Sequence, residues 1–179
     1  MHLLIDPGHG PTTPGKRSPD GKLREFECNY HISLFIQQYL KGKIECSLTT
    51  TGKRDVPLWE RSQMANQLNV DVYVSIHANA FGSHWNAVSG IETYVSKGAS
   101  PASIQLAKSV QKNLVNLTGR LDRGVKQAEF HVLTRTKMPA ILVEVGFMTH
   151  RIECALLLTE AYQKKCAQAI ARALEEQLL

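Results

Sequence analysis

The chain has 179 residues, a length typical of one domain, and we expect residues 1–179 to form a single domain. Hydrophobic residues make up 43% of the chain and charged residues 21%, which excludes a disordered protein. The 21 Lys and Arg outnumber the 16 Asp and Glu, and the formal charge of +5 favours an anionic partner. No helix carries a basic stripe and no nucleic-acid-binding motif is present, so we do not expect that partner to be nucleic acid.

The sequence shows no pattern typical of a membrane span, a secretory signal or a cysteine motif. No apolar run approaches the roughly 20 residues of a membrane span, so no transmembrane segment is expected. The first residues, MHLLID, lack the charged and hydrophobic regions of a secretory signal, so we expect no signal peptide in this chain. The four cysteines form no C-x-x-C motif, which predicts free core residues rather than zinc ligands.

The first half of the chain alternates short apolar strands with helices. Strands are predicted over residues 3–5, 45–50 and 70–77, and a loop rich in Gly, Pro and Lys over residues 10–24. Apolar residues at helical spacing from Ile32 to Leu40 predict a helix that ends at Gly42. A second helix opens at Pro57, and its inward side is predicted to carry Leu58, Arg61, Ala65 and Leu68.

The second half continues the same alternation. Strands are predicted over residues 90–95, 131–133 and 140–145, a helix begins at Ser100-Pro101, and a closing helix covers residues 162–178. Strands alternating with helices predict an α/β three-layer sandwich, with a mostly parallel sheet and helices on both faces. The pattern does not fix the order of the strands.

Three unusual residues occupy the ends of predicted strands, where ligands bind in open α/β sheets. His9 lies in DPGHG, His77 ends DVYVSIHANA, and Glu144 lies within the apolar strand PAILVEVGF. A histidine at a strand end is commonly a hydrogen-bonded structural residue, and a buried glutamate can pair with a core arginine. Together, however, two histidines and nearby carboxylates at one end of a sheet are the ligand chemistry of catalytic zinc.

The third ligand is expected from the segment REFECN, which offers Glu25 and Glu27. Both residues also suit the first turn of a helix, where acids interact favourably with the helix dipole. Spacing alone does not choose between them.

Six blocks of the sequence resemble the zinc-dependent N-acetylmuramoyl-L-alanine amidases, which cleave peptidoglycan. In order, they are LLIDPGHG, EFECN, ERSQMAN…VDVYVSIHANA, GIETYV, DRGVK…FHVL and MPAILVEVGFMTH. The resemblance implies a sheet of about six strands and one Zn²⁺ held by His9, Glu25 and His77. The family's E-x-x-x-N pattern, completed by Asn29, identifies Glu25 as the ligand and Glu27 as a bystander. The resemblance also implies that Glu144 is the catalytic acid.

The function implied is hydrolysis of the amide between N-acetylmuramic acid and L-alanine, with Glu144 taking a proton from water and passing it to the leaving amine. Two alternatives remain open: another zinc hydrolase, such as a deacetylase or carboxypeptidase, and a wall-binding module that holds zinc without turnover. The expected partners are peptidoglycan and anionic wall polymers, and the expected state is a monomer. Two settings fit: a phage or prophage lysin released from the host cytoplasm, or a domain of a secreted enzyme.

Several other side chains are weaker candidates. Asn79 is either a substrate-binding residue or a turn cap, and Arg61 is predicted to form a buried salt bridge rather than to act in catalysis. Arg123 and Lys126 are expected in a solvated basic loop, with stem-peptide carboxylates as the alternative partners. His131 faces either the groove or the core, and the loop after His77 offers a substrate-contacting rim formed by His84 and Trp85.

Overall fold

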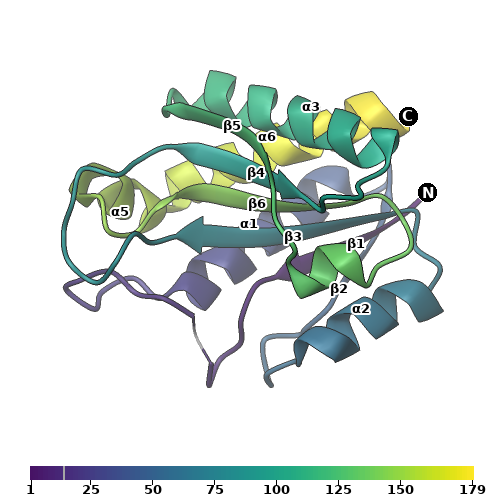
Figure 1. The fold of residues 1–179 in the computed structure, drawn as a ribbon, viewed down its shortest axis with the longest axis horizontal. Coiled ribbons are helices and arrows are strands. Elements are labelled where there is room, and N and C mark those ends of the chain that lie inside the picture. The colour runs from purple at the N-terminus through teal and green to yellow at the C-terminus, as the bar shows by residue number, and fades with distance from the viewer. Residues whose placement is uncertain (14) are drawn as a thin grey trace.

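The fold is an α/β sandwich built on one mixed sheet (Figure 1). The computed structural model describes residues 1–13 and 15–179, and within them the sheet has six strands in the order β2-β1-β3-β6-β4-β5. The strands are β1 His2–Pro7, β2 Glu45–Leu48, β3 Val72–Asn79, β4 Ile91–Val95, β5 Asp122–Gln127 and β6 Ala140–Phe147. Neighbouring strands run parallel except β4 and β6, which are antiparallel. The predicted fold class is confirmed.

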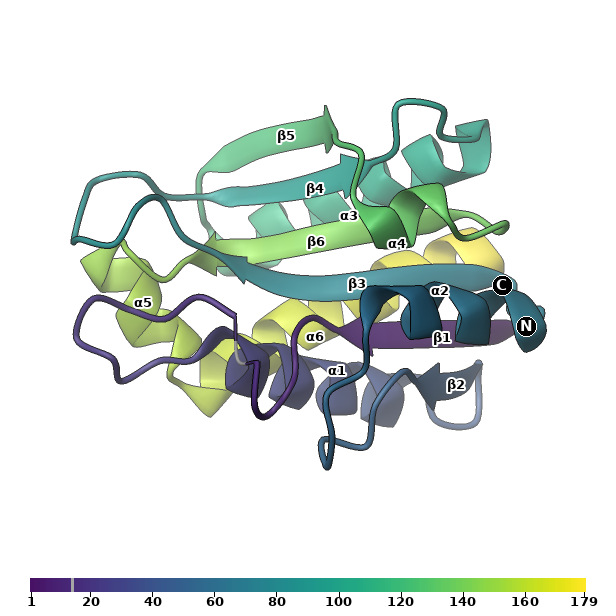
Figure 2. The ribbon, with the colours of Figure 1, turned by 60° about the horizontal axis from the view of Figure 1, so that its bottom comes forward.

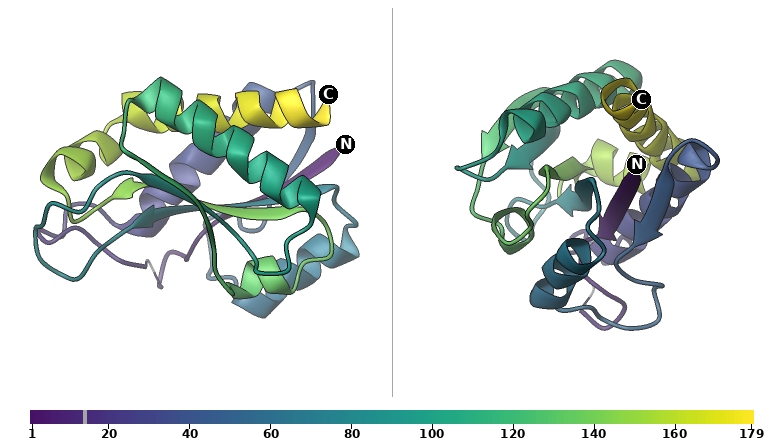
Figure 3. Two further views of the ribbon diagram at one scale, coloured as in Figure 1. Left: turned by 45° about the horizontal axis from the view of Figure 1, so that its top comes forward. Right: turned by 90° about the vertical axis from the view of Figure 1, so that its right-hand side faces the viewer.

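Helices cover both faces of the sheet, as Figures 2 and 3 show. One face packs against the three long helices, α1 Glu25–Leu40, α3 Pro101–Thr118 and α6 Glu160–Leu178, and α5 Arg151–Leu157 lies beside them. The other face packs against the shorter α2 Leu58–Gln67 and α4 His131–Thr134. Alternation along the strands separates the two cores: Leu3 and Ile5 of β1 belong to the larger core, and Leu4 belongs to the smaller one.

The ends of the long helices follow local sequence signals. The Ser100 hydroxyl accepts a hydrogen bond from the Ser103 amide at the start of α3, and Thr159 does the same for Tyr162 at the start of α6. Helix α3 ends at Gly119 in the left-handed conformation, with φ of 65°.

The structure corrects three local predictions. Residues 131–133 form the start of helix α4, not a strand, because a four-residue element is too short to show a period. Strand β5 was not predicted, since it lies at the sheet edge and carries mostly polar residues. Leu58 and Leu68 are 57% and 47% exposed, so the inward side of α2 is defined by Arg61 and Ala65.

The prediction of free core cysteines is confirmed for three of the four. All four are free, and Cys28, Cys154 and Cys166 are buried while Cys46 is half-buried. In the part of the chain that the structure describes, no helix combines the length and hydropathy needed to cross a bilayer.

Candidate metal and active site

His9, Glu25 and His77 meet at the carboxyl end of the central strands. His9 follows β1, His77 lies near the end of β3, and Glu25 opens α1. Glu25 bridges the two rings: its Oε2 lies 3.1 Å from His9 Nε2 and its Oε1 lies 2.8 Å from His77 Nδ1. One ligand atom from each residue lies within 4.8 Å of the others. Glu27, by contrast, is exposed on the outside of α1.

Glycines make this close approach possible. A Cβ placed on Gly8 would lie 2.2 Å from the His77 ring, and one placed on Gly15 would lie 2.5 Å from Glu25 Oε2. Both distances are far shorter than a van der Waals contact, so any side chain at these positions would displace a member of the triad.

The charges within the triad favour a deprotonated carboxylate. Burial raises the pKa of Glu25, but the hydrogen bonds with His77 and His9 outweigh it and bring the pKa to about 2. The backbone amide of Lys16 donates a further hydrogen bond to Glu25 Oε2 at 2.9 Å. Burial lowers the pKa of His77, but the hydrogen bond with Glu25 and the charges of Glu144, Glu25 and Asp6 together outweigh burial and raise it.

This donor set fits a metal ion. Two imidazoles and one ionised carboxylate, with a coordinating atom from each within 4.8 Å, are the three protein ligands typical of a catalytic zinc site. A zinc ion held by these three side chains would have a fourth coordination position for water or substrate.

Glu144 lies beside the triad on strand β6, where it is the direct partner of His77 on β3. Its Oε2 is buried and has no hydrogen-bond partner among the described residues. Burial is the largest cause that raises the pKa of Glu144, to about 8, and the charges of Glu25 and Glu92 raise it further while His77 opposes them. A carboxyl group that titrates near neutral pH is suited to accept and return a proton.

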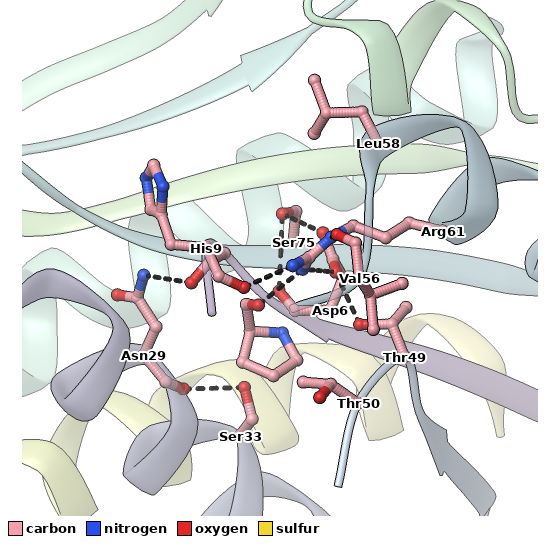
Figure 4. Close-up of polar contacts among 12 residues, drawn as sticks. Asp6, His9, Asn29, Ser33, Thr49, Thr50, Val56, Leu58, Arg61 and Ser75 are labelled. Carbon is pink, nitrogen blue, oxygen red and sulfur yellow. Dashed lines mark hydrogen bonds and ion pairs between the residues drawn. The ribbon is translucent and has the colours of Figure 1, made fainter. Parts of the chain in front are cut away.

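Arg61 holds the turn that carries His9 (Figure 4). Its guanidinium is buried and donates hydrogen bonds to Asp6 Oδ1 at 2.5 Å, to the Pro7 carbonyl at 2.7 Å and to the His9 carbonyl. His9 adopts φ of 70°, a conformation that is unfavourable for a residue with a side chain. The buried salt bridge predicted for Arg61 is therefore present, and it fixes the backbone on both sides of the metal-ligand turn.

Asp6 and Asn29 complete this support. Asp6 accepts hydrogen bonds from Thr49 at 2.6 Å and Ser75 at 2.7 Å. Burial raises its pKa, but Arg61 and these hydroxyls outweigh burial and hold the pKa below its ordinary value. Asn29 donates from Nδ2 to the Gly8 carbonyl at 3.3 Å, so α1 positions the turn from the opposite side.

A cleft of about 540 Å³ runs from the triad along the sheet face that carries α2 and α4. One end contains the triad and Glu144. The other end is largely apolar and is lined by Val56, Pro57, Leu58, Phe130 and Val132. A polar group attacked at the triad would thus have an apolar wall beside it. A second groove of about 570 Å³ lies between α3 and α6, but it contains none of the triad residues.

Comparison with known proteins agrees with this geometry. The profile of the N-acetylmuramoyl-L-alanine amidase family matches residues 3–176. The chain belongs to this family. The predictions of the family and of peptidoglycan amidase activity are thereby confirmed, and the His9–Glu25–His77 site is the metal site expected for it.

Individual relatives cover the whole fold. The N-acetylmuramoyl-L-alanine amidase LytC of Bacillus subtilis is 35% identical over 170 residues, which are 94% of this chain and 34% of LytC. The chain thus spans about a third of the length of LytC. The crystal structure of an N-acetylmuramoyl-L-alanine amidase from Clostridium difficile 630 is 34% identical, with a TM-score of 0.94 over 99% of this chain and 96% of that one. The catalytic domain of CwlV from Bacillus (Paenibacillus) polymyxa var. colistinus is 37% identical, with a TM-score of 0.91 over 99% of this chain and 97% of that one.

The remaining candidates of this amidase-family chain lie around the cleft. Asn79 lines it, donates from Nδ2 to Glu92 Oε1 at 2.6 Å and accepts a hydrogen bond from the Ala80 amide at 2.8 Å. His131 is half-buried, lines the cleft and lies 3.3 Å from the Ser62 hydroxyl. Trp85 packs against the larger core beneath Arg151, whereas His84 is exposed, and neither residue lines the cleft.

The expectation that Arg123 and Lys126 lie in a solvated basic loop is wrong. Both lie on β5 and form ion pairs with Glu92, which is 3% exposed on β4. Sequence reasoning missed Glu92. The available signal was the acid within the apolar strand GIETYV, the same signal that identified Glu144.

Proposed function

We propose that this chain hydrolyses the amide bond between the lactyl group of N-acetylmuramic acid and L-alanine, using one Zn²⁺ held by His9, Glu25 and His77. One observation carries the proposal: three zinc-type donor atoms lie within 4.8 Å of one another, in the same cleft as a carboxyl group whose Oε2 is buried without a hydrogen-bond partner among the described residues. Family membership supplies the substrate class.

The side chains divide the work of such a hydrolysis. When bound, zinc supplies Lewis acidity toward a water molecule and toward the scissile carbonyl. Glu144 accepts the proton of the attacking water and delivers it to the nitrogen of the leaving L-alanine. Arg61 and Asn29 hold the backbone that presents His9. Asn79 is proposed to contact the substrate from the cleft wall.

The two alternative functions make different demands on the same site. A zinc deacetylase or carboxypeptidase would use the same ligands and is distinguished by its products. A wall-binding module would need the metal ligands but has no use for Glu144, because burying a carboxyl group without a partner costs free energy of folding. Glu144 therefore favours an enzyme.

The setting of the reaction is also a proposal. We propose that residues 1–179 are one catalytic domain that acts on the cell wall as a monomer, either as a lysin released from a host cytoplasm or as part of a secreted enzyme. Its net charge of +5 would add attraction to anionic wall polymers. Binding of this kind weakens as salt concentration rises.

Removal of the metal tests the proposal. The purified chain is expected to contain one zinc ion and to clear a suspension of peptidoglycan, and chelation should abolish both until Zn²⁺ is restored. His77→Ala is expected to lose zinc and activity together, because it removes one of three protein ligands. Elemental analysis and loss of turbidity report the two properties.

The control for this experiment is His84→Ala, which removes an exposed histidine outside the triad and should retain both zinc and activity. Full activity in the chelated protein, or a full complement of zinc in His77→Ala, would contradict the proposal.

A further inference from the structure

A second polar cluster lies next to the active site, and its central residue has no part in the hydrolysis described above. Its centre is Glu92, whose carboxylate accepts hydrogen bonds from Asn79 at 2.6 Å, Tyr94 at 3.0 Å and Arg123 Nε at 3.0 Å, and from Lys126 Nζ. Burial raises the pKa of Glu92, but the hydrogen bonds from Lys126, Arg123 and Tyr94 outweigh burial and hold the pKa below its ordinary value. The carboxylate is thus ionised and fully surrounded by donors.

The register of the sheet places this cluster in line with the metal site. His77 on β3 is the partner of Glu144 on β6, and Glu144 is the partner of Glu92 on the next strand, β4. Directly opposite residues in antiparallel strands project from the same face, with Cβ atoms about 5 Å apart. The row then ends at β5, the edge strand, which supplies Arg123 and Lys126; Figure 2 shows the four strands side by side.

Arg123 and Lys126 together carry one more positive charge than is needed to neutralise Glu92. One carboxylate is paired with both a guanidinium and an ammonium group, and the two side chains remain 30% and 36% exposed. Arg123 is also held in place, because it lies 5.0 Å from the centre of the Phe147 ring and donates to the Ser89 carbonyl at 3.3 Å. An oriented guanidinium beside an ammonium group is the donor pattern that recognises a carboxylate.

The distance from Glu144 on β6 to the two cations on β5 is close to the length of two residues of extended peptide. Neighbouring strands are about 4.8 Å apart, so β5 lies about 10 Å from β6 and Glu144. An extended peptide advances roughly 3.4 Å per residue, so a group two residues beyond the scissile amide lies about 7 Å from it. The long side chains of Arg123 and Lys126, which reach back toward β4, cover the difference.

We propose that Arg123 and Lys126 form a subsite for a carboxylate on the second residue of the leaving stem peptide. This proposal rests on the amidase function proposed above and specifies the substrate: a stem peptide with a free carboxylate at that residue binds better than one with a carboxamide. Glu92 then serves to hold both cations in place on the edge strand.

A pair of matched substrates tests the subsite. The substrates are two soluble muramyl peptides that differ only in a free carboxylate or a carboxamide at the second residue. The wild-type chain loaded with zinc is expected to cleave the acid with a kcat/KM about tenfold higher than the amide, mainly through a lower KM, because one charge-assisted hydrogen bond contributes about this factor. In Lys126→Met, which keeps the apolar stem but removes the charge, the ratio should fall toward one.

The matched control is Lys43→Met, which removes an exposed lysine paired with Glu175 outside the cleft and should leave the ratio unchanged. Arg123→Gln is a second variant that should also lower the ratio. Equal cleavage of both substrates by the wild type, or an unchanged ratio in both variants, would overturn the subsite. If the wild type released L-alanine-terminated peptide from neither substrate, the proposed amidase function itself would fail, and the subsite with it.

Discussion

Glu144→Gln is expected to lower kcat for amide cleavage by about 10²–10⁴-fold while zinc remains bound, because general acid–base groups contribute about this much. Glutamine keeps the shape of the side chain but cannot accept and return a proton. The three zinc ligands are untouched, so the zinc content should stay at one ion per chain. Initial rates on peptidoglycan together with elemental analysis measure both quantities.

Glu27→Gln is the control for this substitution, since it makes the same chemical change on the exposed side of α1 and should leave kcat unchanged. A Glu144→Gln chain with zinc and near wild-type turnover would show that another group moves the proton.

Metal-free protein gives an independent readout of the same carboxyl group. Burial raises the pKa of Glu144 from its ordinary value near 4.5 to about 8, so between these pH values the folded chain holds a proton that the unfolded chain releases. The contribution of Glu144 to the free energy of unfolding is therefore fully present below about pH 4.5 and is lost as the pH rises toward 8. Urea denaturation should show a larger loss in the wild type than in Glu144→Gln, because His77, whose pKa is also raised, contributes to a loss in both chains.

Arg61→Ala is expected to lower the free energy of unfolding of the metal-free chain by about 3–5 kcal/mol, because it leaves the buried Asp6 carboxylate without its cation. It also removes the hydrogen bonds to the Pro7 and His9 carbonyls, so the affinity for zinc should fall as well. Urea denaturation measures the first effect, and titration with Zn²⁺ in the presence of a competing chelator measures the second.

Arg54→Ala provides the comparison, since Arg54 pairs with Glu60 at the surface and surface pairs contribute about 0–1 kcal/mol. Equal losses of stability in the two variants, or an unchanged zinc affinity in Arg61→Ala, would contradict the role assigned to Arg61.

Much of the fold followed from periodicity. The buried strands of the sheet are continuous apolar runs, and the long helices carry apolar residues at helical spacing, so both were predicted near their true bounds. Strand β5 and helix α4 were not predicted, because neither has the apolar periodicity of a buried element. An edge strand needs few apolar residues, and a helix of four residues is stabilised by its tertiary contacts rather than by its own pattern.

The site could be predicted where a polar or ionisable residue stands in a segment that is otherwise apolar. Histidines at strand ends and a glutamate inside an apolar strand drew attention to His9, His77 and Glu144. The choice between Glu25 and Glu27 needed the family pattern, and the structure shows the difference as burial: Glu25 is 3% exposed and lies between the two rings, whereas Glu27 faces solvent.

The pairing of Glu92 with Arg123 and Lys126 could not be read from the sequence. These residues are about 30 positions apart and meet only because β5 pairs with β4 at the edge of the sheet. The order of strands is a property of the tertiary fold, and periodicity carries no information about it. The basic segment that contains Arg123 and Lys126, which we expected to be a solvated loop, is therefore half-buried against the Glu92 carboxylate.

The most direct test of the central claim is an analysis of the new chain ends formed when the zinc-loaded protein digests purified peptidoglycan. We expect new L-alanine amino termini, no new reducing sugar ends, and no reaction in the presence of a chelator. Release of D-alanine or acetate, or new reducing ends, would instead show that the cleft carries out a different hydrolysis.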